Sequence, residues 1–592
     1  MIQDKLSALR RELRREHLAA FIFPSGDPHG SEYVPPRWEG RRWISGFDGS
    51  AGTAVVTLHG AALWTDSRYF LAAERQLRGT EYVLMRRKIA GTPTIAEWIA
   101  SQRRADDSTE VGIDGSSISA ADADTLRAAL RHCGGMTLRT NLDVLDRLWS
   151  DRPGVPDGIV EIHPLRYAGE STASKLHRIR SALALQHADG ILVSALDDIA
   201  WTLNMRGNDV ACNPVFVSYL LITAATATLF IDPHKVTHDA ARYLAEQGVS
   251  TRRYDDVRQA LRRYPDYRLL LDPTETNSAL FALARRDIVV RDTSPIPAMK
   301  AIKNEAEIAG FRRSMERDGV AMVRFLRQLL PAVERGGQTE RSADAMLTSL
   351  RSADKAFRGP SFGTIAGYGE HGAIVHYEAT PESDAPLEPH GLLLLDSGAQ
   401  YVDGTTDITR TIALGPTTEE ERRAYTLVLK GHLRLQALCF PDGAAGTQLD
   451  AVARSDMWAE GINYLHGTGH GVGSRLCVHE GPHQIRMEWR GAPLRAGMTV
   501  TDEPGIYVAG RFGVRIENTL LITDHTTTAF GRFLRFEPLT LCPIDTAPIE
   551  HDMLTDDDRR RLNDYHALVA RRLSPLLNDD ERRWLARATA PL

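Results

Sequence analysis

The sequence predicts an α/β protein of three units: two small α/β domains that echo each other, then a larger α+β domain. The length of 592 residues leaves room for two to four domains at ~150 residues each. A tryptophan-led segment near residue 43 recurs near residue 201, and both copies precede apolar strands. From about residue 298 helical and hairpin patterns take over. We therefore expect domains at 1–155, 156–297 and 298–592.

The first unit mixes strands and helices. Residues 19–23 and 53–57 are apolar and predict strands, whereas 71–77 and 95–101 predict helices. The segment 150–158 carries Pro153 and Pro156 and is typical of a linker.

The second unit opens with a predicted helix over 175–186 and a predicted strand over 190–194. Trp43 is followed by apolar strands and Asp66, and Trp201 is followed by apolar strands and Asp232. This echo predicts two copies of one small fold. The uncharged run 211–231 has the length of a membrane span. Its Asn-Pro pair, threonines and β-branched residues favour two buried strands joined by a turn.

The third unit begins with an amphipathic helix over 305–330, whose apolar residues follow helical spacing. Strands, two further helical stretches and a polar, Arg-rich helix after Thr555 follow.

Composition limits the partners and the compartment. A formal net charge of -6 argues against nucleic acid as the main partner, because phosphate binding needs a basic surface. The five cysteines are scattered and form no CxxC pair, which favours a reducing compartment. The N-terminus has no apolar core of the signal-peptide kind. We expect a cytoplasmic protein with neither nucleic acid nor membrane as partner.

Two predicted hairpins each present a pair of carboxylates. A leucine run at 392–395 ends in Asp396, an Asp-Gly turn follows, and a return strand starts at Asp407. Folding near residue 402 sets these two aspartates roughly opposite each other. In the second hairpin Glu503 and Glu517 lie equally far from Gly510. Solvated surface acids are the commonest alternative for any one of them. Four acids beside apolar strands instead predict a bound cation, because like charges are costly to bury.

A histidine and glycine run at 466–473 lies between the hairpins. It lacks the strand and helix context of a phosphate-binding loop. One histidine with four carboxylates is an oxygen-rich ligand set that suits two divalent ions of the Mn²⁺ type. His376 and His479 also stand in apolar or glycine-containing contexts, although a lone histidine is more often a core or surface residue.

Together these motifs resemble the pita-bread metallopeptidases, and within them the long, three-domain form of aminopeptidase P, or Xaa-Pro aminopeptidase. The resemblance covers nearly the whole chain. Its motifs are Ser45-Gly46-Phe47-Asp48-Gly49, Asn213-Pro214-Val215-Phe216, the runs 396–411, 466–473, 503–505 and 515–518, and Phe536-Glu537-Pro538.

The resemblance implies two creatinase-N-terminal-like α/β domains followed by a pita-bread catalytic domain with a C-terminal extension. It implies a homodimer, two divalent ions, with Mn²⁺ as the expected metal, and peptides with proline at position two as substrates. Five metal ligands are implied, with Asp407 and Glu517 bridging: Asp396, Asp407, His470, Glu503 and Glu517. Three histidines are implied to handle substrate: His376, His466 and His479. The family commonly has tyrosine after Glu-Pro-Gly, whereas this chain has Ile506 and then Tyr507.

Such a site implies hydrolysis by a hydroxide that two metals share. Glu503 is expected to accept the proton of that water, and His376 or His479 to help stabilise the oxyanion. The substrate's amine near one metal limits cleavage to the first residue. The preference for proline rests on the resemblance alone.

Four alternatives share the fold. Prolidase uses the same ligands on dipeptides, but the length and the duplicated units favour aminopeptidase P. A methionine aminopeptidase should lack those units. A metal-free peptide-binding protein, such as a histone-chaperone subunit, should have lost ligands, and creatinase needs no metal. All five expected ligands are present in this chain.

Overall fold

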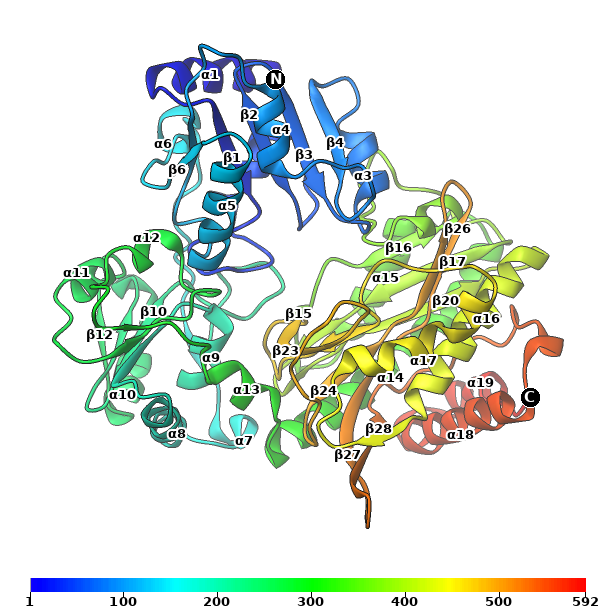
Figure 1. Ribbon diagram of the computed structural model, residues 1–592. Coiled ribbons are helices and arrows are strands. Elements are labelled where there is room, and N and C mark those ends of the chain that lie inside the picture. The colour runs from blue at the N-terminus through cyan, green and yellow to red at the C-terminus, as the bar shows by residue number, and fades with distance from the viewer. Residues whose placement is uncertain (1) are drawn as a thin grey trace. The chain divides into compact units, whose positions relative to one another are not determined.

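A computed structural model describes residues 2–592. The chain forms two compact units. The first comprises the residues up to His163 together with Glu170–Ile296, and the second comprises Pro164–Gly169 with Pro297–Leu592. The first unit contains two α/β sheets, and the second contains the helices and hairpins of the predicted third domain (Figure 1).

The first sheet has six strands in the order β4-β3-β2-β1-β5-β6. Its strands are β1 (Ala20–Pro24), β2 (Thr53–Thr57), β3 (Ala61–Thr65), β4 (Tyr82–Arg86), β5 (Glu110–Ile113) and β6 (Thr137–Arg139). Its helices are α1 (Ile2–Arg15), α2 (Gly40–Ser45), α3 (Phe70–Gln76), α4 (Ile95–Gln102), α5 (Ala120–His132) and α6 (Leu145–Leu148). These elements agree with the strands and helices predicted for the first unit.

The second sheet repeats that topology in the order β12-β11-β10-β8-β13-β14. In both sheets the central strand pairs antiparallel with one neighbour and parallel with the other. Its strands are β8 (Gly190–Val193), β10 (Tyr219–Thr223), β11 (Ala227–Phe230), β12 (Val249–Arg252), β13 (Leu269–Leu270) and β14 (Val289–Val290). Trp43 lies on α2 and Trp201 on α9 (Leu196–Leu203), whereas Asp66 directly follows β3 and Asp232 lies two residues after the end of β11. The predicted repeat is confirmed.

The remaining elements of this unit are short or helical. They are β7 (Glu161–Ile162), β9 (Met205–Arg206), α8 (Thr172–Leu185), α10 (His238–Glu246), α11 (Asp256–Arg262) and α12 (Ser278–Phe281). The uncharged run forms the antiparallel pair β10 and β11, as predicted. Within residues 2–592 no helix is both long and apolar enough to cross a membrane.

A buried polar seam joins the two sheet domains within the first unit. Nδ1 of His29 lies 3.0 Å from the Ser194 carbonyl, and its Nε2 lies 2.9 Å from Tyr254 Oη. Asn277 Nδ2 donates to Pro28 O at 2.8 Å. Since Nδ1 must carry the proton to bond a carbonyl, Tyr254 donates to Nε2. Burial lowers the pKa of His29, which keeps the ring neutral.

The second unit contains two halves of similar design. The first half pairs α14 (Glu305–Glu334) and α15 (Glu340–Ser352) with the antiparallel sheet β16-β17-β20. The strands are β16 (Ile365–Tyr368), β17 (Leu392–Ser397) and β20 (Ile408–Ala413), and η3 (Gly369–Ala373) follows β16. The N-terminus of α14 is fixed by Asn304, whose side chain accepts the Ala306 and Glu307 N–H groups.

The second half pairs α16 (Glu419–Gln436) and α17 (Gly446–Ala459) with the sheet β21-β28-β27-β24. Its strands are β21 (Cys439–Pro441), β24 (Thr499–Asp502), β27 (Asn518–Thr528) and β28 (Gly531–Pro538). Smaller strand pairs complete the unit: β15 (Phe357–Pro360), β18 (Ala399–Tyr401), β19 (Gly404–Thr405), β22 (Gly469–Gly471), β23 (Glu480–Ile485), β25 (Gly505–Val508) and β26 (Phe512–Arg515). The linking helices α7 (Leu165–Ala168) and α13 (Ile296–Ala301) stand at the unit boundary.

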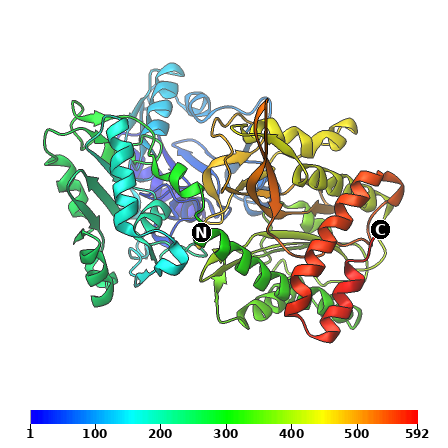
Figure 2. The same ribbon diagram turned by 90° about the horizontal axis from the view of Figure 1, so that it is seen from below.

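The chain ends in two helices, α18 (Asp556–Leu573) and α19 (Asp579–Ala588), drawn red in Figure 2. Both pack on α14, and α18 also packs on α16. The sequence pattern predicted one polar helix here. The structure gives α18 a buried stripe that includes Leu562, Tyr565, Val569 and Leu573.

Candidate metal centre

Asp396 and Asp407 lie on the first predicted hairpin. Asp396 is on β17 and pairs with Thr409 on β20, so Asp407 lies two residues short of the position opposite Asp396. The predicted opposition is therefore off by two residues. The reason is that the turn is not simple: β18 and β19 leave the hairpin and pair with each other, and β18 pairs with β15. The two carboxylates still interact, since Asp407 contributes to raising the pKa of Asp396.

Glu503 and Glu517 lie on the second hairpin, where the prediction agrees with the register. Asp502 pairs with Asn518 and Gly505 pairs with Arg515, which places Glu503 across from Glu517. Glu517 is 1% exposed and accepts a hydrogen bond from Thr409 Oγ1 at 2.7 Å. The two hairpins are thus joined directly at the carboxylates.

His470 lies on β22 between these hairpins. Its Nε2 is 3.4 Å from Asp407 Oδ2 and 3.6 Å from Glu503 Oε1, and its Nδ1 donates to Gly471 O at 2.9 Å. One ligand atom from each of Asp407, His470 and Glu517 lies within 4.8 Å of the others, a spacing that one cation can bridge.

The carboxylates are held close in a buried place. Burial raises the pKa of Glu503 to about 7, and burial with the neighbouring acids raises the pKa of Glu517 well above its ordinary value. Burial disfavours the charged ring of His470, but Asp407 and Glu503 outweigh it and raise the pKa of His470 to about 9. Shifts in this direction are typical of crowded carboxylates whose like charges a bound cation would balance.

The residues present fit a divalent metal pair. Asp396 Oδ1 is buried and has no hydrogen-bond partner within the described chain, so it is a carboxylate oxygen that lacks compensation. The other four candidates add carboxylate oxygens and one imidazole nitrogen. This hard donor set matches Mn²⁺ or a similar ion rather than a thiolate site.

Two supporting residues were missed in the sequence. Arg515 Nη2 donates to Asp396 Oδ2 at 2.6 Å, and its Nη1 donates to Tyr507 Oη at 2.8 Å. Thr409, besides bonding Glu517, accepts a hydrogen bond from Arg515 Nε at 3.3 Å. Thr409 lies two residues after Asp407, and Arg515 lies two residues before Glu517. Alternation along a strand puts such residues on the same face, and that signal could have found both.

The three candidate substrate histidines are half-buried around this cluster. His479 makes an edge contact with the His470 ring at 4.3 Å between centroids. His466 Nε2 lies 2.8 Å from Tyr507 Oη. His376 directly follows Val375, whose carbonyl accepts from Arg515 at 3.3 Å.

Ile506 and Tyr507, the pair after Glu-Pro-Gly, face different surroundings. Ile506 is 5% exposed and belongs to an apolar core cluster. The Tyr507 hydroxyl joins His466 to Arg515 and so to Asp396. Burial raises the pKa of Tyr507 to about 12, so the hydroxyl keeps its proton. The departure from the family pattern therefore leaves a tyrosine hydroxyl at the site.

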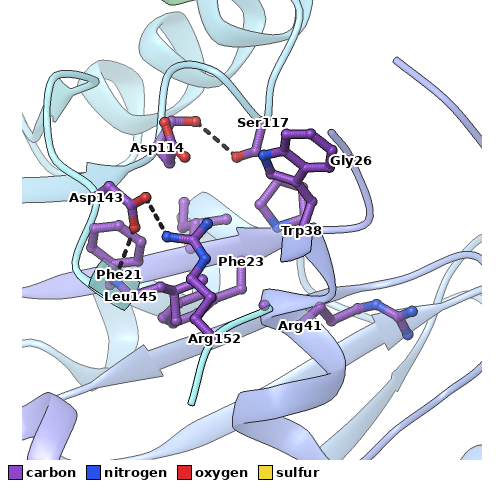
Figure 3. A pocket seen from close by; sticks show the side chains of 13 residues that line it. Phe21, Phe23, Gly26, Trp38, Arg41, Asp114, Ser117, Asp143, Leu145 and Arg152 are labelled. Atoms are coloured by element: carbon purple, nitrogen blue, oxygen red, sulfur yellow. Dashed lines mark hydrogen bonds and ion pairs between the residues drawn. The ribbon is translucent and has the colours of Figure 1, made fainter. Parts of the chain in front are cut away.

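A small cavity near Asp114 and Asp143 also contains carboxylates, but it does not resemble a metal or peptide site. A cavity of about 30 Å³ lies in the first sheet domain. Asp114, Asp143 and Arg152 are among the residues that line it (Figure 3). Arg152 Nη1 donates to Asp143 Oδ2 at 2.6 Å, so that acid is already paired. The volume has room for about one or two waters and none for a peptide.

Comparison with known proteins agrees with this division of the chain. Models of the creatinase/prolidase N-terminal domain match residues 5–141 and 151–307. The model of metallopeptidase family M24 matches residues 309–524, and the model of its C-terminal region matches residues 532–592.

Relatives of the same length decide the family. A probable Xaa-Pro aminopeptidase P of Paracoccidioides brasiliensis (strain Pb03) is 39% identical over 613 residues, covering 100% of this chain and 99% of that protein. The chain belongs to the Xaa-Pro aminopeptidase P family. Aminopeptidase P2 of Arabidopsis thaliana is 40% identical over 633 residues, covering 100% of this chain and 89% of that protein.

Solved structures extend the likeness to the whole fold. X-prolyl aminopeptidase from Caenorhabditis elegans, described as a cytosolic enzyme with a di-nuclear active site, superposes with a TM-score of 0.96 at 32% identity, covering 100% of both chains. Xaa-Pro dipeptidase from Bacillus anthracis covers 63% of this chain with a TM-score of 0.52 at 24% identity, which shows the fold alone. The predicted fold, two creatinase-like domains and a pita-bread domain, is confirmed.

Proposed function

We propose that this protein is a metal-dependent aminopeptidase that hydrolyses the bond between the first residue and a proline in second position. The observation that carries the proposal is the joined pair of hairpins, which gathers four carboxylates and His470 in a chain of this family. The full-length likeness to enzymes named for this activity supports the substrate class.

We assign metal binding to Asp396, Asp407, His470, Glu503 and Glu517, with Asp407 and Glu517 bridging. Thr409 orients Glu517, and Arg515 orients Asp396 through the hydrogen bonds described above. Divalent ions held by these five residues would lower the pKa of a water and so supply hydroxide near neutral pH. Mn²⁺ fits the donor set, and metal analysis of purified protein tests that choice.

The chain's own residues have distinct parts in this reaction. Glu503 is half-buried and is assigned as proton acceptor from the attacking water. One of His376 and His479 is assigned to the developing oxyanion, where a positioned donor is worth ~3 kcal/mol. His466 is held by Tyr507 and is assigned to substrate binding.

Assembly and location follow from the same resemblance. We propose a cytosolic homodimer, in line with the cytosolic description of the nematode enzyme. Sedimentation of the purified 65.5 kDa chain and fractionation of cells test the two statements.

The test of function compares three substrates with chelator-stripped protein, with and without added Mn²⁺. We expect metal-dependent release of the first residue from Xaa-Pro-Yaa, and little from Xaa-Ala-Yaa or from the dipeptide Xaa-Pro. Cleavage of the dipeptide alone would make the protein a prolidase. Failure to cleave any of the three with metal bound would favour a peptide-binding protein.

A further inference from the structure

Arg410 occupies an unusual position beneath the candidate metal centre. It lies on β20, three residues after Asp407, and is 1% exposed. Six oxygens lie within hydrogen-bonding distance of its five N–H groups, and none of them belongs to a carboxylate: Thr409 O, Glu517 O, Asn518 Oδ1, Cys542 O, Pro543 O and Tyr565 Oη. A buried cation held only by neutral acceptors depends on having all of them in place.

One of these acceptors is the main chain of a candidate ligand. Arg410 Nη1 donates to Glu517 O at 2.7 Å, and Nη2 donates at 2.9 Å to the side chain of Asn518, the next residue. Asn518 Nδ2 donates in turn to Gln436 Oε1 on α16 at 2.7 Å. Arg410 therefore holds the backbone that carries the Glu517 carboxylate through hydrogen bonds to Glu517 O and to the Asn518 side chain.

The C-terminal helix α18 supplies a further hydrogen-bond partner of Arg410, Tyr565. Tyr565 is 3% exposed, and its hydroxyl accepts from Arg410 Nη2 at 2.9 Å. The same hydroxyl has carbonyl acceptors at 3.0 Å (Cys542 O) and 3.1 Å (Thr540 O). Tyr565, 155 residues along the chain from Arg410, thus ties the guanidinium to the segment of Thr540 and Cys542 that leads into the C-terminal region.

We propose that Tyr565 is a positioning residue of the metal centre, acting through Arg410 on the backbone of Glu517. The C-terminal helices would then set metal affinity as well as cover the core. The proposal rests on the metal ligands assigned above. Partners behind the ligands of a metal typically change its affinity 10–100-fold when removed.

The test replaces Tyr565 by phenylalanine in the full-length chain and measures Mn²⁺ affinity of the chelator-stripped protein by calorimetric titration without substrate. We expect Tyr565→Phe to bind Mn²⁺ at least ~10-fold more weakly than wild type. Activity on Xaa-Pro-Yaa should return when Mn²⁺ is raised, with KM for the peptide unchanged.

A matched control separates this role from loss of stability. Tyr425 on α16 is also fully buried, and its hydroxyl donates to a carbonyl, Asp545 O, at 2.6 Å. No hydrogen bond joins it to Arg410 in the part of the chain that the structure describes. Tyr425→Phe should lower the melting temperature of the metal-free protein about as much as Tyr565→Phe and leave Mn²⁺ affinity unchanged.

Two results would overturn the proposal: Mn²⁺ affinity of Tyr565→Phe equal to wild type, or equal losses in both tyrosine variants. If Tyr565→Phe does not fold, Arg410→Lys is used instead. Lysine keeps the positive charge but lacks the planar guanidinium that bonds several acceptors at once. We expect the same loss of Mn²⁺ affinity. A wild-type chain that binds no Mn²⁺ would instead contradict the metal site assigned under the proposed function.

Discussion

Next to Tyr565, His566 makes the fold sensitive to acid. Its Nε2 accepts the Ile544 N–H at 3.1 Å, so this nitrogen carries no proton in the folded protein. Burial, aided by the nearby charge of Arg410, lowers the pKa of His566 to about 4 from the ordinary 6.5. The folded pKa lies below the unfolded one. The stabilisation is therefore fully present above about pH 6.5 and is lost as the pH falls toward 4.

Replacing His566 by glutamine should remove this sensitivity, because an amide oxygen can accept the same N–H without titrating. Between pH 6.5 and 4 the wild type should lose about 3 kcal/mol more of its free energy of unfolding than the variant. Urea unfolding at a series of pH values measures the difference. Since both proteins share all other titrating groups, parallel curves for the two would contradict the assignment.

At the residue scale, residue type and spacing were enough to predict that the five candidate metal ligands lie together. Asp396, Asp407, Glu503, Glu517 and His470 lie in one cluster, as their two hairpins and the intervening glycine run suggested. Their supports were less visible. Arg515 and Thr409 could have been found by strand alternation. Arg410 and Tyr565 meet across 155 residues, and no local pattern in a sequence encodes a contact of that range.

At the scale of elements, Glu340 fixes the loop that carries His376. This residue, the first of α15, is 0% exposed. Its carboxylate accepts from Tyr368 N at 2.8 Å, His371 Nδ1 at 2.9 Å and Tyr377 Oη at 2.8 Å. His371 lies on η3 and Tyr377 directly follows His376. The loop is therefore held on both sides of the histidine.

Changing Glu340 to glutamine should lower kcat/KM for Xaa-Pro-Yaa ~10-fold, because an amide cannot accept from all of these donors and the loop shifts. In a His376→Ala background the same change should cost little more, since both act through one imidazole. Fully additive losses would show that Glu340 acts elsewhere. Glu307→Gln is the control: Glu307 is another buried helix-start glutamate, bonded to Asn304 N.

The hairpins show where element-level prediction ends. The second register was predictable, because Gly510, at a φ of +72°, marks the turn midway between Glu503 and Glu517. The first was off by two residues because the turn at Val402 and Asp403 closes a small inner hairpin, β18 with β19, and not the β17–β20 pair itself. A turn signal locates a reversal but does not say which strands it joins.

At the scale of the molecule, the first unit should unfold as one body because of its polar seam. His29 bonds Ser194 and Tyr254 across the two sheet domains; His29 and Ser194 are buried, and Tyr254 is half-buried. Removing the ring would leave the buried Ser194 carbonyl without this donor, at a cost of about 1–3 kcal/mol.

His29→Ala should therefore separate the two domains energetically. In wild type, amides of β1 and β10 should exchange with similar free energies of opening, whereas in the variant the two values should diverge. Hydrogen exchange followed by mass spectrometry of the full chain measures both. His59→Ala is the control, because His59 pairs with Asp107 inside the first domain. Continued matching of β1 and β10 in His29→Ala would contradict the prediction.

The overall architecture was largely readable because it is repetitive. The similar segments at Trp43 and Trp201 predicted a duplicated sheet, and the strand orders of the two sheets agree. The seam was not readable, since His29 occurs in no recognisable pattern and its partners lie more than 160 residues away.

The two halves of the second unit also bear on ancestry. One half supplies Asp396 and Asp407 from a strand pair backed by two helices, and the other supplies Glu503 and Glu517 from a similar arrangement. Either half alone offers two carboxylates, which is too few for a pair of ions. A forerunner of half the length would have needed to associate with its own twin to bind them. Fusion of two such copies would have made the pairing permanent and left each copy free to change.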